Sequence, residues 1–199
     1  VNQYLSQMNF EYFQGPVSDM ASLSKGEKTC GICKRVGQCF ELESAIICSE
    51  EANEVGYGCS ECLAAGKFEF WHDTDIGMLD EKGLTKVYKH NQPPPDNFPE
   101  AALVALRRTP QIVTWQQELW LTHCNDFMVY QGTWSPSDFY KSASNGDGRA
   151  LFLEMTDDGK NLWDGSLPEG KTILKDWHAT YYAFKCRHCG KLRGNWDCD

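Results

Sequence analysis

The spacing of apolar residues divides this chain into short helices and short strands. Trp115, Leu119 and His123 recur at i, i+4 and i+8, and this helical spacing predicts an aromatic-faced helix over residues 115–124. Further helices are expected over 98–108 and from Ser135 onward, and strands over 127–134, 151–155 and 181–197. Because these elements follow one another without a strand–helix–strand rhythm, they predict an α+β fold.

Cysteine pairs separated by two residues carry the clearest chemical signal. Three such pairs occur: Cys30 with Cys33, Cys59 with Cys62, and Cys186 with Cys189. The two sulfurs of one tight turn can face the same ion, and two such turns complete the tetrahedron that Zn²⁺ prefers. We therefore expect the first two pairs to hold one zinc ion between them; a set of buried free thiols is the alternative.

The segment between the first two pairs fits a small zinc module. Apolar residues over 38–42 and 46–48 predict two strands joined by a turn, and good helix formers follow Cys62. A knuckle, a hairpin and a helix start in this order resemble a treble-clef or zinc-ribbon module. The helix N-terminus should also favour the thiolate forms of Cys59 and Cys62.

The third pair has no matching pair nearby, so its partners stay open. Cys186 and Cys189 need two further ligands, and the candidates are His123 and Cys124 at the end of the predicted helix, and Cys198. A hairpin with packed cysteines is one alternative. A redox-active pair is another, although no helix starts directly after the pair to lower a thiol pKa.

Cysteine usage also bears on the compartment. The chain has ten cysteines, and its start, VNQYLSQMNF, has neither the basic nor the apolar region of a secretion signal. No apolar run approaches the roughly 18 residues that span a bilayer. We therefore expect a cytoplasmic protein without a membrane segment, whose cysteines are thiols or ligands; disulfides stay open if the N-terminus was trimmed. Cys39 and Cys48 lack paired spacing and are interpreted as packing residues.

A proline-rich stretch at His90–Asp96 predicts a connector between two parts of the chain. The expected organisation is an N-terminal extension (1–29), a zinc-binding cysteine-rich module (30–90), and an α+β domain (97–199) that ends in a Cys-x-x-Cys knuckle. The cysteine-rich module is expected to pack on the mixed helix and antiparallel-sheet domain.

Motifs typical of catalysis are missing from the sequence. It contains no GxSxG, HExxH or Walker A pattern, and Gly170-Lys-Thr172 lacks the upstream glycine of a phosphate loop. His123 and Cys124 are adjacent on the predicted helix, where neighbouring side chains point about 100° apart, so they are not a ready nucleophile–base pair. We therefore expect a protein that works by binding, with a zinc hydrolase or redox enzyme as the less favoured alternative.

The formal charge of −9 disfavours nonspecific nucleic-acid binding and favours a basic protein partner. One feature keeps a zinc-dependent nucleic-acid-binding function as an alternative. Basic residues gather around the third cysteine pair, near Trp196, which can stack on a base: Lys185, Arg187, His188, Lys191 and Arg193.

Several short segments between about Cys30 and the C-terminus form a recognisable combination. They are Arg107-Arg-Thr-Pro110, Trp115-Gln-Gln-Glu118, Trp120-Leu121, His123-Cys124, Phe184-x-Cys-x-His-Cys-Gly-Lys191, Trp196-Asp-Cys198, and Cys59-x-x-Cys62 followed by Leu-Ala-Ala-Gly66. Together they resemble the bacterial CbrC family. The family is named for tolerance to a nuclease colicin. The resemblance therefore implies a tolerance or immunity-type protein that neutralises a protein toxin with a basic surface by binding it, or a stress-response protein, and it implies no enzymatic reaction.

Overall fold

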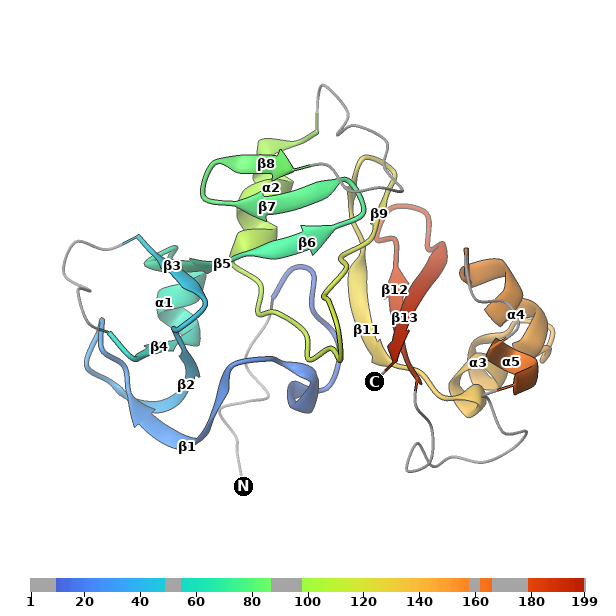
Figure 1. Cartoon of the computed structure of the whole chain (residues 1–199), viewed down its shortest axis with the longest axis horizontal. Helices are drawn as coiled ribbons and strands as arrows, with labels where there is room; N and C mark the ends of the chain where they lie inside the picture. The colour runs from blue at the N-terminus through green and yellow to red at the C-terminus, as the bar shows by residue number, and fades with distance from the viewer. Residues whose placement is uncertain (1–9, 49–54, 87–97, 158–161, 166–178, 199) are drawn as a thin grey trace.

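Short antiparallel strands and short helices make up the chain (Figure 1). The computed structural model describes residues 10–48, 55–86, 98–157, 162–165 and 179–198. The predicted connector at His90–Asp96 lies outside these residues. The fold class is α+β, as predicted, and every strand pairing within the named sheets is antiparallel.

The first two cysteine pairs lie in a small sheet-and-helix module. Its main sheet has the order β1-β2-β4, and a second, two-stranded sheet pairs β3 with β5. The elements are β1 (Leu23–Thr29), β2 (Val36–Glu41), β3 (Ala45–Ile47), β4 (Tyr57–Cys59), α1 (Ser60–Ala64) and β5 (Phe68–Phe70), preceded by the 3-10 turn η2 (Val17–Asp19). Because β1 pairs with β2, part of the predicted N-terminal extension belongs to the sheet that carries the first knuckle.

A three-stranded meander and a helix follow this module. The meander comprises β6 (His72–Thr74), β7 (Gly77–Asp80) and β8 (Gly83–Lys86), and α2 (Glu100–Arg107) packs against β7. The helix confirms the prediction over 98–108. A parallel bridge joins Thr74 of β6 to Trp120, so the segment after α2 runs beside the meander.

The C-terminal part is built around the sheet β11-β12-β13. Before it lies a minimal hairpin of β9 (Thr122–His123) and β10 (Asp126–Phe127). The sheet strands are β11 (Val129–Thr133), β12 (Ala179–Lys185) and β13 (Leu192–Cys198), and the helices are α3 (Pro136–Ser142), α4 (Gly148–Met155) and α5 (Leu162–Gly165). Strands β11, β12 and β13 confirm the predicted strands over 127–134 and 181–197, and α3 begins beside Ser135 as predicted.

Two hydrophobic clusters cover the two faces of this sheet. Successive residues of a strand point to opposite faces. Tyr182 and Phe184 accordingly join the large cluster that also contains the cysteine module, whereas Tyr181 and Ala183 join the cluster formed with α3, α4 and α5. Figure 1 shows these helices against one side of the sheet and the rest of the chain against the other.

The predicted helix over 115–124 is wrong. Trp120 bonds to β6 through its backbone, donating to the Asp73 carbonyl at 2.7 Å and accepting from the Asp75 amide at 3.0 Å. Its ring is fully buried against His72 and Phe184. Pairing with β6 and burial of this ring therefore override the local helical spacing.

Two further local predictions are wrong. Residues 151–155 belong to α4 and not to a strand; the Asp147 side chain accepts from the Ala150 amide at 2.9 Å and so caps this helix. The two strands predicted within 38–48 exist as β2 and β3, but they form no hairpin with each other because each pairs with a different partner.

Among the described residues, no helix is both long enough and apolar enough to cross a membrane.

Candidate metal centres

The N-terminal centre brings together the first two cysteine pairs. Cys30 and Cys33 lie in the turn between β1 and β2, Cys59 ends β4, and Cys62 lies in α1. The Cys30 and Cys62 sulfurs are 3.8 Å apart, and those of Cys33 and Cys59 are 3.5 Å apart. Four sulfurs from two distant turns thus surround one point, as the spacing predicted.

Local backbone geometry forms the knuckle of this centre. The amides of Cys33 and Cys59 each donate to the Cys30 sulfur at 3.4 Å. Gly31 follows Cys30 where a Cβ atom would lie only 2.1 Å from a methyl carbon of Val55. Only glycine therefore fits there without a shift of its neighbour, and the turn can close over the sulfurs.

Hydrogen bonding and burial act in opposite directions on these thiols. Burial opposes ionisation of Cys30, but the backbone amides of Cys33 and Cys59 lower its pKa to about 7. Burial raises the pKa of Cys62 to about 12, and it also raises the pKa of Cys59. The Cys62 amide, at the start of α1, does lower the pKa of Cys59, as expected of a helix N-terminus, but burial outweighs this effect.

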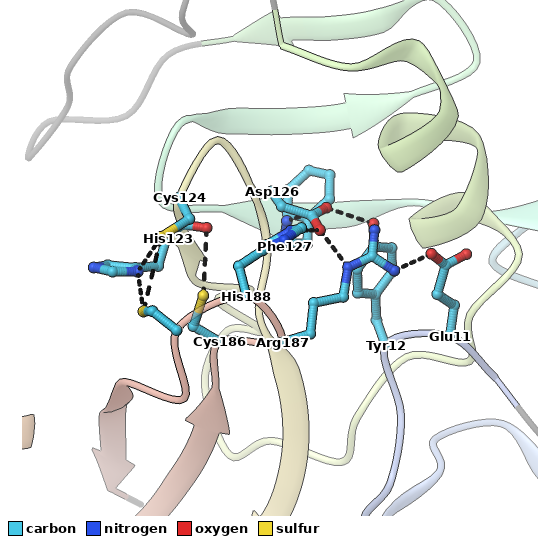
Figure 2. Close-up of polar contacts among 10 residues, drawn as sticks. Glu11, Tyr12, His123, Cys124, Asp126, Phe127, Cys186, Arg187 and His188 are labelled. Carbon is cyan, nitrogen blue, oxygen red and sulfur yellow. Dashed lines mark hydrogen bonds and ion pairs between the residues drawn. The ribbon is translucent and has the colours of Figure 1, made fainter.

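The C-terminal centre brings together His123, Cys124, Cys186 and Cys189. Their ligand atoms all lie within 4.8 Å of one another. The Cys124 sulfur is 3.8 Å from that of Cys189, and both face His123 Nδ1, at 3.2 and 3.4 Å (Figure 2). Two of the three candidate partners of the third pair are thus at the site.

A tight turn, and not a helix end, presents His123 and Cys124. His123 pairs with Asp126 across the β9–β10 hairpin, which leaves Cys124 and Asn125 as the two turn residues. Both have positive φ, 55° and 56°, as a type I′ turn requires. The argument that these neighbours diverge on a helix is therefore wrong, since the turn brings the Cys124 sulfur and the His123 ring into contact.

The remaining cysteines lie outside both centres. Cys198 pairs with Ala179 at the end of the β12–β13 hairpin that is far from the knuckle, so it is not placed to complete the C-terminal centre. Cys39 is fully buried in β2, as expected of a packing residue, and burial raises its pKa to about 11. Cys48 is exposed, which corrects its interpretation as a packing residue.

Both centres fit a tetrahedral zinc ion by donor type and spacing. Zn–S bonds of about 2.3 Å at tetrahedral angles place sulfur atoms about 3.8 Å apart. The S···S separations of 3.5 and 3.8 Å lie within about 0.3 Å of the separation expected around one ion. Thiolate and imidazole donors suit Zn²⁺, whereas Mg²⁺ and Ca²⁺ prefer oxygen. Each centre offers four protein ligands.

A buried carboxylate, Asp126, ties the C-terminal centre to the N-terminal segment (Figure 2). It accepts from the Tyr12 hydroxyl at 2.6 Å and faces His188 Nε2 at 2.7 Å; Arg187 Nε also donates to it. Burial opposes its ionisation, but these bonds hold its pKa below the usual value. Arg187 in turn pairs with Glu11. The sequence reading missed this network, although a signal exists: Arg187 and His188 stand between the two cysteines of the third pair.

A groove lies between β6 and the segment 111–118. It has a volume of about 560 Å³, and its lining contains two carboxylates and no lysine or arginine. Trp71 and Val113 line it at 45% and 53% exposure, and Trp115 beside it is 63% exposed. Asp197 accepts from the amides of Trp115 and Gln116 at 2.8 and 3.1 Å, and these bonds hold the backbone at the edge of the groove in place. The groove therefore presents aromatic side chains and the Asp73 carboxylate, whereas the Glu118 side chain is only 10% exposed and accepts from the Ile112 amide.

These features define a class: a cysteine-rich α+β protein with two four-ligand candidate metal centres. The chain matches the model of the Uncharacterised protein family (UPF0167) over residues 8–198, and it belongs to this family. No solved structure matches it.

Proposed function

We propose that this protein is a zinc-stapled, cytoplasmic binding protein with one ion in each centre. The observation that carries the proposal is the presence of four protein ligands at each cluster, Cys₄ in one and Cys₃His in the other. A site with four protein ligands leaves no open position for the water or substrate that catalytic zinc requires. This favours a structural role over the zinc hydrolase alternative.

We further propose that the partner is a protein toxin with a basic surface, neutralised by direct binding. The resemblance to the CbrC family, the net charge of −9 and the acidic, cation-free groove support this. Exposed tryptophans beside carboxylates suit the lysine and arginine side chains of such a partner, through cation–π contact and charge attraction.

The nucleic-acid alternative loses support from the surroundings of its basic residues. Arg193 pairs with Asp75 and Asp157, at 2.9 and 3.0 Å, and Arg187 pairs with Asp126 and Glu11. Guanidinium groups bound to carboxylates attract phosphate less, because their charge is already balanced.

Metal analysis tests the first part of the proposal. We expect about two zinc ions per chain in protein purified without added metal, as the two ligand sets imply. Purified protein without zinc would overturn it.

Binding to a basic nuclease toxin tests the second part. We expect capture of a toxin encoded beside this gene, weakened about tenfold or more by Trp71→Ala, since interface tryptophans are frequent hot spots. Tyr140→Ala is the matched control, because Tyr140 is 44% exposed and does not line the groove. Absence of binding to any basic toxin would contradict the proposed partner. Equal effects of the two variants would contradict the proposed binding surface.

A further inference from the structure

The two centres differ in their access to solvent. Cys30, Cys59 and Cys62 are at most 6% exposed, and only Cys33 is half-buried. In the C-terminal centre, Cys124 and Cys189 are exposed, His123 is half-buried and Cys186 alone is buried. Since the shell around a metal site controls solvent access, an ion in the C-terminal centre is open to chelators and competing thiols.

The two halves of the C-terminal centre are held differently. His123 and Cys124 come from a hairpin with two residues in each strand, and an isolated hairpin is marginally stable at best. The other two ligands come from the knuckle at the end of the longer β12–β13 hairpin. Val129, two residues beyond β10, pairs with Lys185 beside Cys186, so the two loops lie close together, and an ion would link their tips, which the described strand pairing does not join directly.

The same two loops contact the side chains of the N-terminal segment, whose backbone is bonded to Tyr130 of β11 at 2.8 and 2.9 Å. Asp126 lies two residues beyond Cys124, and Arg187 and His188 lie between Cys186 and Cys189. The Arg187 guanidinium stacks over the Tyr12 ring, 5.1 Å from its centroid, and pairs with Glu11. If the loops separate, the buried Asp126 loses two of its three side-chain partners, and Glu11 and Tyr12 lose their contact with Arg187.

We propose that the C-terminal centre is an exchangeable zinc site whose occupancy controls how tightly Glu11 and Tyr12 dock on the β9–β10 hairpin. The inference rests on the proposed zinc occupancy and adds a metal-responsive function to one of the two centres. The N-terminal centre, buried in the main core, holds its ion permanently.

Coupling of this kind is reciprocal, because a ligand that tightens docking is itself held more tightly by the docked state. Removing the Tyr12 hydroxyl should therefore weaken zinc binding at the C-terminal centre, although Tyr12 is not a ligand. Coupling between two sites typically changes affinity by about 5- to 150-fold.

The test is a titration of the zinc-loaded full chain with a colorimetric zinc chelator, combined with amide hydrogen exchange over residues 10–14. We expect two separate release steps, with faster exchange in this segment after the first step only. Cys189→Ser should abolish the first zinc-release step, and Cys33→Ser should abolish the second. Release in one step, or unchanged exchange after the first step, would overturn the inference.

Tyr12→Phe provides the sharper comparison, with Tyr182→Phe as its matched control. Tyr182 also donates to a buried carboxylate, Asp197, at 2.8 Å, but it has no contact with the centre. We expect the first variant to lower the zinc affinity of the C-terminal centre by about tenfold and the second to leave it unchanged. Equal affinities in both variants would refute the coupling while leaving the proposed zinc occupancy intact, whereas a chain that binds no zinc at all would remove both.

Discussion

At the residue scale, His72 is a buried histidine with an oxygen at each ring nitrogen. Nδ1 lies 2.9 Å from Glu118 Oε2, and Nε2 lies 3.1 Å from the Thr109 carbonyl oxygen. A carbonyl can only accept, so Nε2 carries a proton. Both nitrogens are thus occupied, and the pair serves to hold residues 109–118 against β6 instead of transferring protons in the groove.

Glu118→Ala tests this structural role. The change removes the carboxylate that faces His72 Nδ1 and leaves the Ile112 amide, which donates to Glu118 at 2.9 Å in the native chain, without its acceptor. We expect a loss of about 3 kcal/mol of unfolding free energy, because removing one partner of a buried pair strands the other. Urea unfolding measures it.

The control for this variant is Glu61→Ala. Glu61 forms an exposed ion pair with Arg35 at 3.8 Å, and such pairs contribute at most about 1 kcal/mol. A loss at Glu118 no larger than at Glu61 would contradict the role assigned to the buried pair.

Single residues were predictable where chemistry is local. The gap of two residues in Cys30-x-x-Cys33 and Cys59-x-x-Cys62 itself sets the geometry of a knuckle, so the gathering of these four cysteines follows from the sequence. The partners of Cys186 and Cys189 depend on where a distant hairpin lies in space. Sequence spacing therefore could not choose between Cys124 and Cys198.

At the element scale, the segment 115–124 shows why periodicity misled. The spacing of Trp115 and Leu119 is that of a helix, yet Trp115 is exposed and its amide is held by Asp197 from β13. The long-range acceptor Asp197 and the bridge to β6 decide the conformation of this segment, and neither can be inferred from the local pattern of apolar residues. The helix predicted over residues 98–108 is confirmed, because the spacing of its apolar residues is set by one packed face.

Loss of one ligand should unfold one module and not the other. Cys62→Ser removes a ligand of the N-terminal centre, and structural zinc typically supplies on the order of 10–16 kcal/mol in small peptides. We expect zinc content to fall from about two ions to about one, and amide protection to be lost in β1, β2, β4 and α1 while β11–β13 keep theirs. Hydrogen exchange by mass spectrometry reads both regions in one experiment.

Cys48→Ser is the matched control for this change, since Cys48 is exposed and lies outside both centres. Retained protection in β1 and β2 of the Cys62→Ser protein would show that the ion is not what holds the module.

At the scale of the whole molecule, the sheet β11-β12-β13 joins two cores. The fold class was predictable because it needs only the order of elements, whereas the packing of α3 and α4 on one face was not. That packing depends on rings such as Phe139, which contacts Trp134, Phe152, Trp163 and Tyr181.

Phe139→Ala should therefore destabilise the sheet β11-β12-β13 and the helices packed on it. Emptying this fully buried site is expected to cost about 3–5 kcal/mol, because the cavity adds to the lost transfer free energy. Thermal unfolding, followed by circular dichroism, measures the resulting fall in melting temperature. Val36→Ala, at a residue 69% exposed, should leave the transition in place, and a similar response of the two variants would speak against a shared sheet.

The two ligand sets also impose an order of assembly on a growing chain. Cys30 to Cys62 lie within one short stretch, while His123 must wait for Cys189 before its set is complete. Since domains form as synthesis proceeds from the N-terminus, the first ion can be captured while later residues are still being added. The ion proposed for the second set can be captured only after Cys189, in the turn between β12 and β13, has been made, so its capture reports that both distant loops are present.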